Sequence, residues 1–439
     1  MTGPKQLDQI TDDILKPIRF NLSFQIWMGF LTISLLICLY AYYLQLRDGL
    51  GVAGIRDYVS WGMYIANFVF FVAASLIGML SSAVLGLLNI KWAGPIGRIS
   101  EIIALAFASV SGIVIVMDMG RPERLLYVFT HARIQSPILW DVTVVITYIA
   151  ISALLLYLPL IPDIKICHEK LENAPKFMKR IYKILSLGWT GSPEQHKIAH
   201  KSIQILLVLI IPVALGIHTV TSWLFASTSR TGWDSSIFGP YFVTGAFVSG
   251  CSAVIIAMYF FRKSYKLENF ITEKMFDKMG KLIVLVALVY LYFNINEFLV
   301  PAYKMKKFDA VHIREIFTGS YALLFWFVQI FGLILPIIIL IFKKARKPLP
   351  MLVIAIFVFV CAWLKRLIIV VPTQLHPILP IQNVPEYFKF YTPTLIETAI
   401  TLASFILVLM IITILSKIFP IIPINDQCLN KNYVTDSNL

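Results

Sequence analysis

Long apolar runs separated by short polar connections make up most of this chain. Ten of them are long enough to cross the roughly 30 Å hydrocarbon core of a bilayer. Because backbone exposed to lipid must satisfy its own hydrogen bonds, each run is predicted to form a helix. The runs fall near residues 22–46, 58–86, 98–117, 137–161, 202–224, 239–262, 282–299, 319–343, 350–371 and 396–417. The pattern therefore predicts an all-α polytopic membrane protein with ten transmembrane helices.

Local signals refine this picture. Proline after serine or threonine, at Ser136-Pro137 and Thr392-Pro393, marks two helix starts. The amphipathic stretch Pro175–Leu187, followed by Gly188, predicts an interfacial helix and a turn. A faint echo between the segments that begin at Trp61 and Phe238 suggests two related four-helix bundles, spans 2–5 and 6–9, with spans 1 and 10 peripheral.

Composition and charge fix the class and the orientation. Apolar residues are 58% of the chain, charged residues 14%, and the mean hydropathy is +0.79, which a soluble core cannot absorb. The net charge is +14, and the connections on the side of the termini carry more than twice the Lys and Arg of the opposite side. In a membrane protein this bias reports orientation and not nucleic-acid binding, so both termini are placed in the cytoplasm and the chain in the cytoplasmic membrane.

The predicted organisation follows from these spans. Residues 1–21 form a cytoplasmic N-terminus, 22–57 a peripheral helix with its outer loop, 58–224 the first bundle, 239–371 the second bundle, 396–417 a peripheral tenth helix and 418–439 a cytoplasmic tail.

The stretch from 118 to 141 draws attention because it sets charges at the mouth of an apolar hairpin. Asp118 closes span 3, Arg121 follows it, and Asp141 lies near the start of span 4. Ionisable groups at this depth are costly, so they are candidates for function. An interfacial Asp–Arg pair that only fixes the loop is the alternative, and the residues alone leave it open.

Other polar residues also fall in the outer half of the predicted spans. His218 and Ser222 lie in span 5, Glu297 near the outer end of span 7, and Arg366 in span 9. Glu297 is either functional or a structural counter-charge for Arg366, and the sequence does not decide between these. Asn67 lies inside span 2, and Glu101, near the cytoplasmic end of span 3, is the main exception to the outer clustering.

Several chemistries are excluded or disfavoured. The five cysteines are scattered and form no CxxC pair, so we expect no iron–sulfur cluster, structural zinc or other metal site in this chain. His218 is the one histidine within an apolar run, which disfavours a transmembrane haem with two histidine ligands. An outer pocket of a few hydrogen-bonding groups with apolar walls suits an amphiphile, and a quinol fits: Asp141 and His218 would take its hydroxyl protons.

At these residues the chain resembles the NrfD / polysulfide reductase membrane-subunit family. The resembling stretches begin at Val59, Asp118, Ser136, Leu158, Leu187, Ile217, Ile237, Asn296 and Trp363, and they follow the family order. The resemblance implies ten helices in two four-helix bundles, menaquinol bound near the outer face, no covalently bound cofactor, and a ferredoxin-like iron–sulfur partner that takes the electrons. Its site residues in the first bundle would include Asp118, Asp141 and His218. Leu76 stands where some branches carry a histidine, which puts a quinone-ligand role of span 2 in doubt and leaves the branch open.

The leading hypothesis is thus a membrane subunit of a respiratory complex that exchanges electrons between menaquinol or menaquinone and an iron–sulfur subunit on the outer face, beside further catalytic or cytochrome subunits. The quinol-binding residues would be Asn67, Asp118, Arg121, Asp141, His218 and Ser222, with Asp118, Asp141 and His218 in the catalytic role; a proton path would use Glu101, Glu297 and Arg366. A secondary transporter and a purely structural anchor in the lipid bilayer are the rival interpretations.

Overall fold

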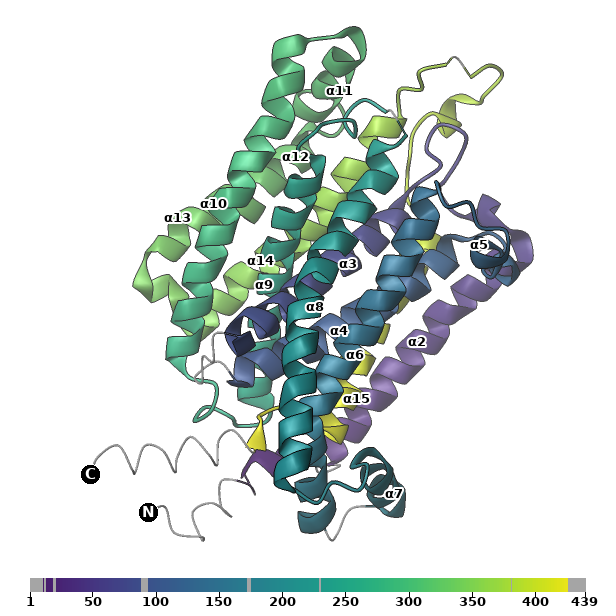
Figure 1. The fold of residues 1–439 in the computed structure, drawn as a ribbon. Helices are drawn as coiled ribbons and strands as arrows, with labels where there is room; N and C mark the ends of the chain where they lie inside the picture. Colours follow the sequence, from purple (N-terminus) through teal and green to yellow (C-terminus); the bar gives the residue numbers. More distant parts are fainter. Residues whose placement is uncertain are drawn as a thin grey trace.

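The computed structural model describes residues 11, 13–18, 21–87, 94–171, 175–228, 230–379 and 381–424. Within these ranges the regular elements are helices, without a strand. Ten helices are long and apolar enough to span a membrane, which confirms the predicted fold class (Figure 1). The expectations for residues 1–10, for Cys428 and for the tail beyond residue 424 lie outside the described residues.

The ten spans follow the apolar runs closely. They are α2 (Leu22–Asp48), α3 (Met63–Leu87), α4 (Gly94–Asp118), α6 (Pro137–Lys170), α8 (Pro193–Ala226), α9 (Phe238–Ser264), α10 (Glu273–Lys304), the composite α12, η5 and α13 (Ala322–Gln329, Ile330–Ile334 and Leu335–Ile341), α14 (Pro348–Val370) and α15 (Leu395–Ile418). The connections hold η1 (Lys16–Ile18), η2 (Leu50–Val52), η4 (Pro122–Arg124), α5 (Tyr127–Thr130), α7 (Lys176–Leu185), α11 (Lys307–Phe317), η6 (Lys343–Arg346), η7 (Pro372–Gln374) and η8 (Glu386–Phe388).

Helix ends show where the sequence signals were sufficient. Pro137 opens α6 as predicted, and α7 is the expected short amphipathic helix, followed by Gly188 with a positive φ of 67°. The start at Thr392-Pro393 is wrong by two residues: α15 begins at Leu395, because the Thr394 hydroxyl caps the helix by accepting the amide of Glu397, its third residue. The eighth span was predicted as one uninterrupted helix, but η5 is a π-helical turn within it.

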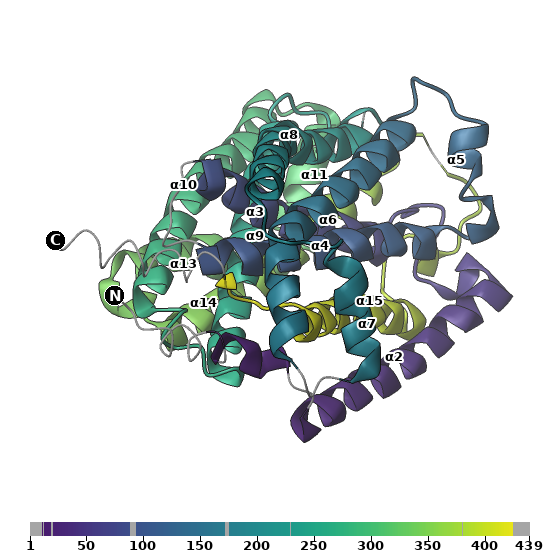
Figure 2. The ribbon, with the colours of Figure 1, turned by 60° about the horizontal axis from the view of Figure 1, so that its bottom comes forward.

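Helix α3 is the centre of the molecule. The most apolar stretch of α3 is entirely buried, and the helix contacts α4, α8, α9, α14 and α15. Helix α2 is the most exposed span and packs against α15 at the edge (Figure 2). Helices α3, α4, α6 and α8 pack together as one group, and α9, α10, α12–α13 and α14 pack together as another. These contacts support the predicted division into two bundles, which stays an interpretation of the packing.

Small residues allow α3 to approach its neighbours closely. A Cβ on Gly78 would lie 2.2 Å from the carbonyl oxygen of Ser100 on α4, and one on Gly250 of α9 would lie 2.2 Å from Ile77 Cγ2. Backbones that approach this closely are typical of helix pairs in membranes.

The two ends of the bundle are different. The terminal face carries η1, α7 and the segment after α15, and Lys417 Nζ donates a 2.6 Å hydrogen bond to the Pro17 carbonyl there. The distal face, at the other end, carries α5, α11 and the connection from α14 to α15 (Figure 1). Since the described chain ends meet at one face, the structure agrees with an even number of spans.

Candidate functional site

Asp141 of α6 bonds to α8 one helical turn away from His218. Asp141 lies one turn inside α6 and is only 4% exposed, and its Oδ1 accepts a 2.6 Å hydrogen bond from Thr221 Oγ1 on α8. Because Thr221 follows His218 by three residues, the two side chains share one face of α8. The predicted acid and imidazole therefore flank the same α6–α8 contact.

The His218 ring carries an unused nitrogen. His218 is 2% exposed, and its Nδ1 lies 3.1 Å from the Ala214 carbonyl oxygen. A carbonyl can only accept, so this contact requires the hydrogen on Nδ1. Nε2 is buried and makes no hydrogen bond of good geometry to the described residues. The ring points toward α3, where the backbone of Val72 is a polar neighbour, and Arg366 of α14 lies within electrostatic range.

Asp118 belongs to a different group of side chains. It ends α4 beside Tyr64 of α3 and Glu397 of α15, and its Oδ1 is buried without a hydrogen-bond partner. Arg121 is exposed on the connection after α4, and no ion pair joins it to Asp118 or Asp141 within the described ranges. The structure thus gives the two aspartates different neighbours.

Sequence reasoning missed Glu397, which is fully buried at the centre of this second group. Its carboxylate accepts from the backbone amides of Gly54 and Met63, at 3.0 and 3.1 Å, and from the Tyr391 hydroxyl at 2.5 Å. Burial and the adjacent Glu397 charge raise the pKa of Tyr391, so this phenol stays a donor. Gly54 is required here, since a Cβ would lie 2.4 Å from the carbonyl oxygen of Thr392.

The other predicted quinol ligands are already bonded within the protein. Asn67 is fully buried; its amide donates to Thr401 Oγ1 at 2.8 Å and accepts from Trp363 Nε1 at 2.7 Å. Asn67 therefore ties α3 to α15 and α14. The Ser222 hydroxyl donates to the Thr219 carbonyl at 2.6 Å and faces Gly239 of α9.

The residues of the predicted proton path lie in separate places. Glu101 of α4 accepts a hydrogen bond from Ser82 of α3, in the half of the bundle nearer the terminal face. Glu297 of α10 accepts a 2.6 Å bond from Ser235, and its charged neighbours are Lys365 and Asp234. No ion pair joins Glu297 to Arg366 in the part of the chain that the structure describes, so the counter-charge interpretation is not what the contacts show.

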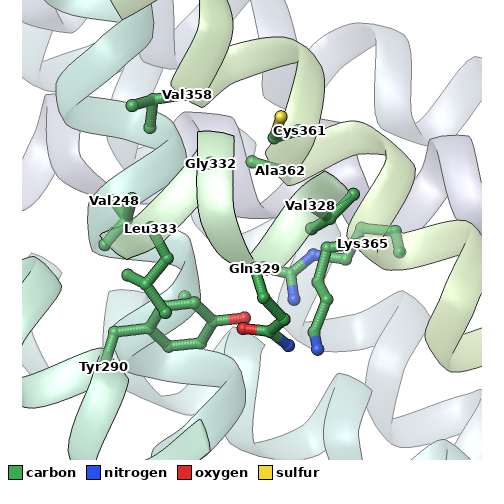
Figure 3. A pocket seen from close by; sticks show the side chains of 12 residues that line it. Val248, Tyr290, Val328, Gln329, Gly332, Leu333, Val358, Cys361, Ala362 and Lys365 are labelled. Carbon is green, nitrogen blue, oxygen red and sulfur yellow. The ribbon is translucent and has the colours of Figure 1, made fainter. Parts of the chain in front are cut away.

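Three cavities lie in the second group of helices, toward the distal face. The first, of about 20 Å³, is lined by residues of α9, α10, α12, η5 and α14, including Gln329, Lys365 and Arg366 (Figure 3). The second, of about 30 Å³, shares Lys365 with it and contains Glu297 and His312. The third, of about 20 Å³, shares His312 with the second. None of these three is lined by Asp118, Asp141 or His218.

His312 is a functional candidate that the sequence did not single out. It lies on α11, outside the spans, and burial lowers its pKa to about 4, with a smaller contribution from the charge of His376. His376 in turn lies 3.5 Å from Glu315. In the described ranges, no three His, Cys, Asp or Glu side chains are grouped so that they could hold a metal ion.

Comparison with known proteins gives a match over most of the chain. A family model described as Polysulphide reductase, NrfD, matches residues 51–377, from the connection before α3 to the segment after α14. A selenate reductase subunit of Mesobacillus selenatarsenatis is 24% identical over 394 residues, covering 86% of this chain and 90% of that protein. The Hdr-like menaquinol oxidoreductase integral membrane subunit of Archaeoglobus fulgidus is 23% identical over 395 residues, 88% of this chain and 90% of that protein. The menaquinone reductase integral membrane subunit of Nitratidesulfovibrio vulgaris is 23% identical over 426 residues, 92% of this chain and 94% of that protein.

Proposed function

The chain belongs to the NrfD family, and on that premise we propose that it is the quinone-interacting membrane subunit of a respiratory oxidoreductase, in which electrons pass between menaquinol or menaquinone and an iron–sulfur partner. Two relatives that cover nearly the whole chain carry menaquinol or menaquinone in their names, which supports a quinone as the lipid-soluble reactant. The relatives' description as subunits supports the presence of catalytic partners.

The observation that carries the proposal is the pairing of Asp141 with Thr221 one turn from the unpartnered Nε2 of His218. A quinol supplies two hydroxyl hydrogens and two electrons when it is oxidised. The free lone pair of His218 is placed to accept a hydroxyl hydrogen, and the Asp141 carboxylate to hold the second proton. Thr221 keeps the carboxylate oriented, and the apolar walls of α6 and α8 exclude water.

The group of side chains around Glu397 and Asp118 would stabilise the distal surface beside this site. Glu397 holds the start of α3, and Asp118 ends α4 next to it. The connection that follows exposes large apolar side chains at Leu126 and Tyr127, 68% and 55% exposed, beside the exposed Arg121. Apolar and cationic side chains on one connection suit a partner protein, so the iron–sulfur partner is placed at the distal face.

Orientation and proton exchange belong to the same proposal. The excess of Lys and Arg on the terminal-face connections supports an orientation with that face in the cytoplasm and the distal face outside. In the second bundle, the first and second cavities share Lys365, and the second and third share His312. Side chains that can exchange protons are therefore spaced from the distal surface to Glu297 and Arg366. Glu101 would serve the cytoplasmic half, which would couple quinol chemistry to proton translocation.

The test is Asp141→Asn in the assembled complex. We expect kcat/KM for a menaquinol analogue with an artificial acceptor to fall by about a hundredfold or more, since positioned acid–base groups contribute that much. Thr221→Val keeps the carboxylate but removes its hydrogen bond, and should cost about tenfold. Asp57→Asn, an exposed residue near the start of α3, is the matched control. Wild-type turnover by Asp141→Asn in an intact complex would remove the role of Asp141, while the family assignment would stand.

A further inference from the structure

The first cavity of the second bundle holds two adjacent cations. Lys365 and Arg366 of α14 line it and are 4% and 2% exposed. Lys365 Nζ and both Nε and Nη1 of Arg366 are buried, and no described residue is a hydrogen-bond partner of these atoms. Figure 3 shows Lys365 beside Gln329 and Tyr290, at the polar end of a cavity whose other walls are valine, leucine and alanine side chains. Donors without acceptors at this depth are costly and need a compensating group.

Among the described residues, a carboxylate acts on one of these cations only. Glu297 acts on the charge of Lys365 from α10. The described neighbours of Arg366 are aromatic: the ring of Phe242 lies 5.3 Å from its Cζ, and Tyr241 and Tyr290 are close. A guanidinium does not lose its proton in proteins, so Arg366 keeps its positive charge. The local excess is therefore one permanent positive charge.

The backbone keeps space open at Arg366. A Cβ on Gly245 of α9 would lie 3.2 Å from Arg366 Nη2 and 2.9 Å from Tyr290 Cε2, so a larger residue would displace the guanidinium. On the other side, the π-helical turn η5 carries Gly332 against Cys361, where a Cβ would lie 2.4 Å from that side chain. π-Helical turns within α-helices occur frequently at functional sites. Both features frame the cavity that the cations line.

Two further cavities lie between this one and the distal face. The second shares Lys365 with the first, and the third shares Thr231, His312 and Thr373 with the second. The third is lined by Arg230 and His376. Glu297 is the one carboxylate among the residues that line the three cavities, and Asp234 and Glu315 act on His312 from outside that lining.

We propose that a small inorganic anion of halide or nitrate size binds Arg366 in the first cavity and reaches it from the distal face. The guanidinium donates charge-assisted hydrogen bonds to the anion from its two unpartnered nitrogens. Lys365 adds to the attraction, and the apolar walls select an ion that sheds its water readily. The anion makes the buried cluster of Glu297, Lys365 and Arg366 electrically neutral. This assignment does not depend on the quinol site, because its residues lie outside the α6–α8 contact, although Glu297 and Arg366 also belong to the proposed proton path.

Binding of radiolabelled chloride to the purified, assembled complex tests the proposal. We expect saturable binding that unlabelled bromide and nitrate displace. Arg366→Gln should weaken chloride binding by at least about tenfold, because it removes the permanent charge and two charge-assisted hydrogen bonds. Lys344→Gln makes the same change of charge on the exposed connection before α14, and should leave binding unchanged. Asp141→Asn should also leave it unchanged, which separates this site from the proposed quinol site.

A second variant keeps the test decisive if Arg366→Gln does not assemble. Ala362→Leu adds apolar volume to the same cavity without a change of charge, and it should also weaken chloride binding. Size-exclusion chromatography establishes that each variant is assembled before its binding is measured.

Three results would overturn the assignment: no saturable chloride binding by the wild-type complex, undiminished binding by assembled Arg366→Gln, or, where that variant is lost, undiminished binding by Ala362→Leu. Displacement of chloride by decanoate but not by nitrate would assign the cations to a lipid carboxylate and would equally refute an inorganic anion.

Discussion

The buried ion pair between α4 and α6 allows a quantitative prediction about stability. Arg98 Nη1 lies 2.5 Å from Asp163 Oδ2, with side chains 5% and 1% exposed, and the same carboxylate oxygen accepts the Ile424 amide at 3.3 Å. Arg98 also reaches the Pro159 and Pro420 carbonyls at 3.4 Å. Removing one partner leaves the other charge buried and unpaired, which costs about 3–5 kcal/mol.

This cost converts to a shift of the unfolding midpoint. With an unfolding entropy of about 2.1 cal/mol/K per residue, a chain of 439 residues loses about 1 °C per kcal/mol. Arg98→Met and Asp163→Leu should therefore each lower the midpoint by about 3–5 °C. The double variant removes both charges and leaves an apolar contact, so it should return to within about 1 °C of the wild type.

The buried cysteines provide the assay. Cys38, Cys167, Cys251 and Cys361 are free and buried, so a thiol-reactive fluorophore labels them only as the helices separate. Lys165→Met breaks an exposed Lys–Glu pair on the same helix and is the control, with an expected shift below about 1 °C. Additive losses in the double variant would refute the reasoning, because they would show that the two side chains contribute separately and not as a pair.

Two further predictions concern α11 and the contact between the bundles. Because burial and the charge of His376 lower the pKa of His312 to about 4, the unfolded chain binds the proton first as the pH falls. Stability should then decrease from about pH 6.5 toward pH 4, and His312→Gln should flatten this decrease in melting curves measured across that range; an identical pH profile would contradict it. Gly250→Ala would put a Cβ 2.2 Å from Ile77 Cγ2 and should destabilise the complex by about 1–3 kcal/mol in thermal unfolding. Gly112→Ala, with open space around its Cβ, should not destabilise it. Equal effects of the two variants would show that the α3–α9 contact rearranges to accommodate the added Cβ.

Hydropathy predicted the spans because length and apolar content suffice for a helix in lipid. The apolar run 137–161 gave the start of α6, but the helix continues to Lys170, since backbone hydrogen bonds persist where the side chains become polar. The π-helical turn Ile330–Ile334 could not be predicted from the hydropathy pattern, because the sequence remains apolar on both sides of it. Helix α11 was also missed, since it lies between two spans and its charges were interpreted only as loop charges.

The site was harder to predict, because lateral neighbours depend on how each helix is rotated. Asp141 and His218 were chosen for their depth, and the structure bonds Asp141 to Thr221, one turn after His218 on α8. Glu397 forms part of a capping pattern with Thr394, which indicates a local helix start, although its carboxylate reaches α3. Lys365 stood beside Arg366 in the sequence, yet only the packing of α14 shows that both line one cavity.

The bonds of Glu397 also constrain the order in which the protein is completed. The backbone amides of Gly54 and Met63 are made early in translation, but their acceptor, on α15, follows them by 343 and 334 residues. The second span is therefore inserted before the acceptor of the Gly54 and Met63 amides exists, and these amides gain that partner only when the tenth span is inserted. The hydrogen bonds at the entrance to α3 are therefore completed only once α15 is made. A chain truncated before α15 would lack these bonds in its first half as well as the helix itself.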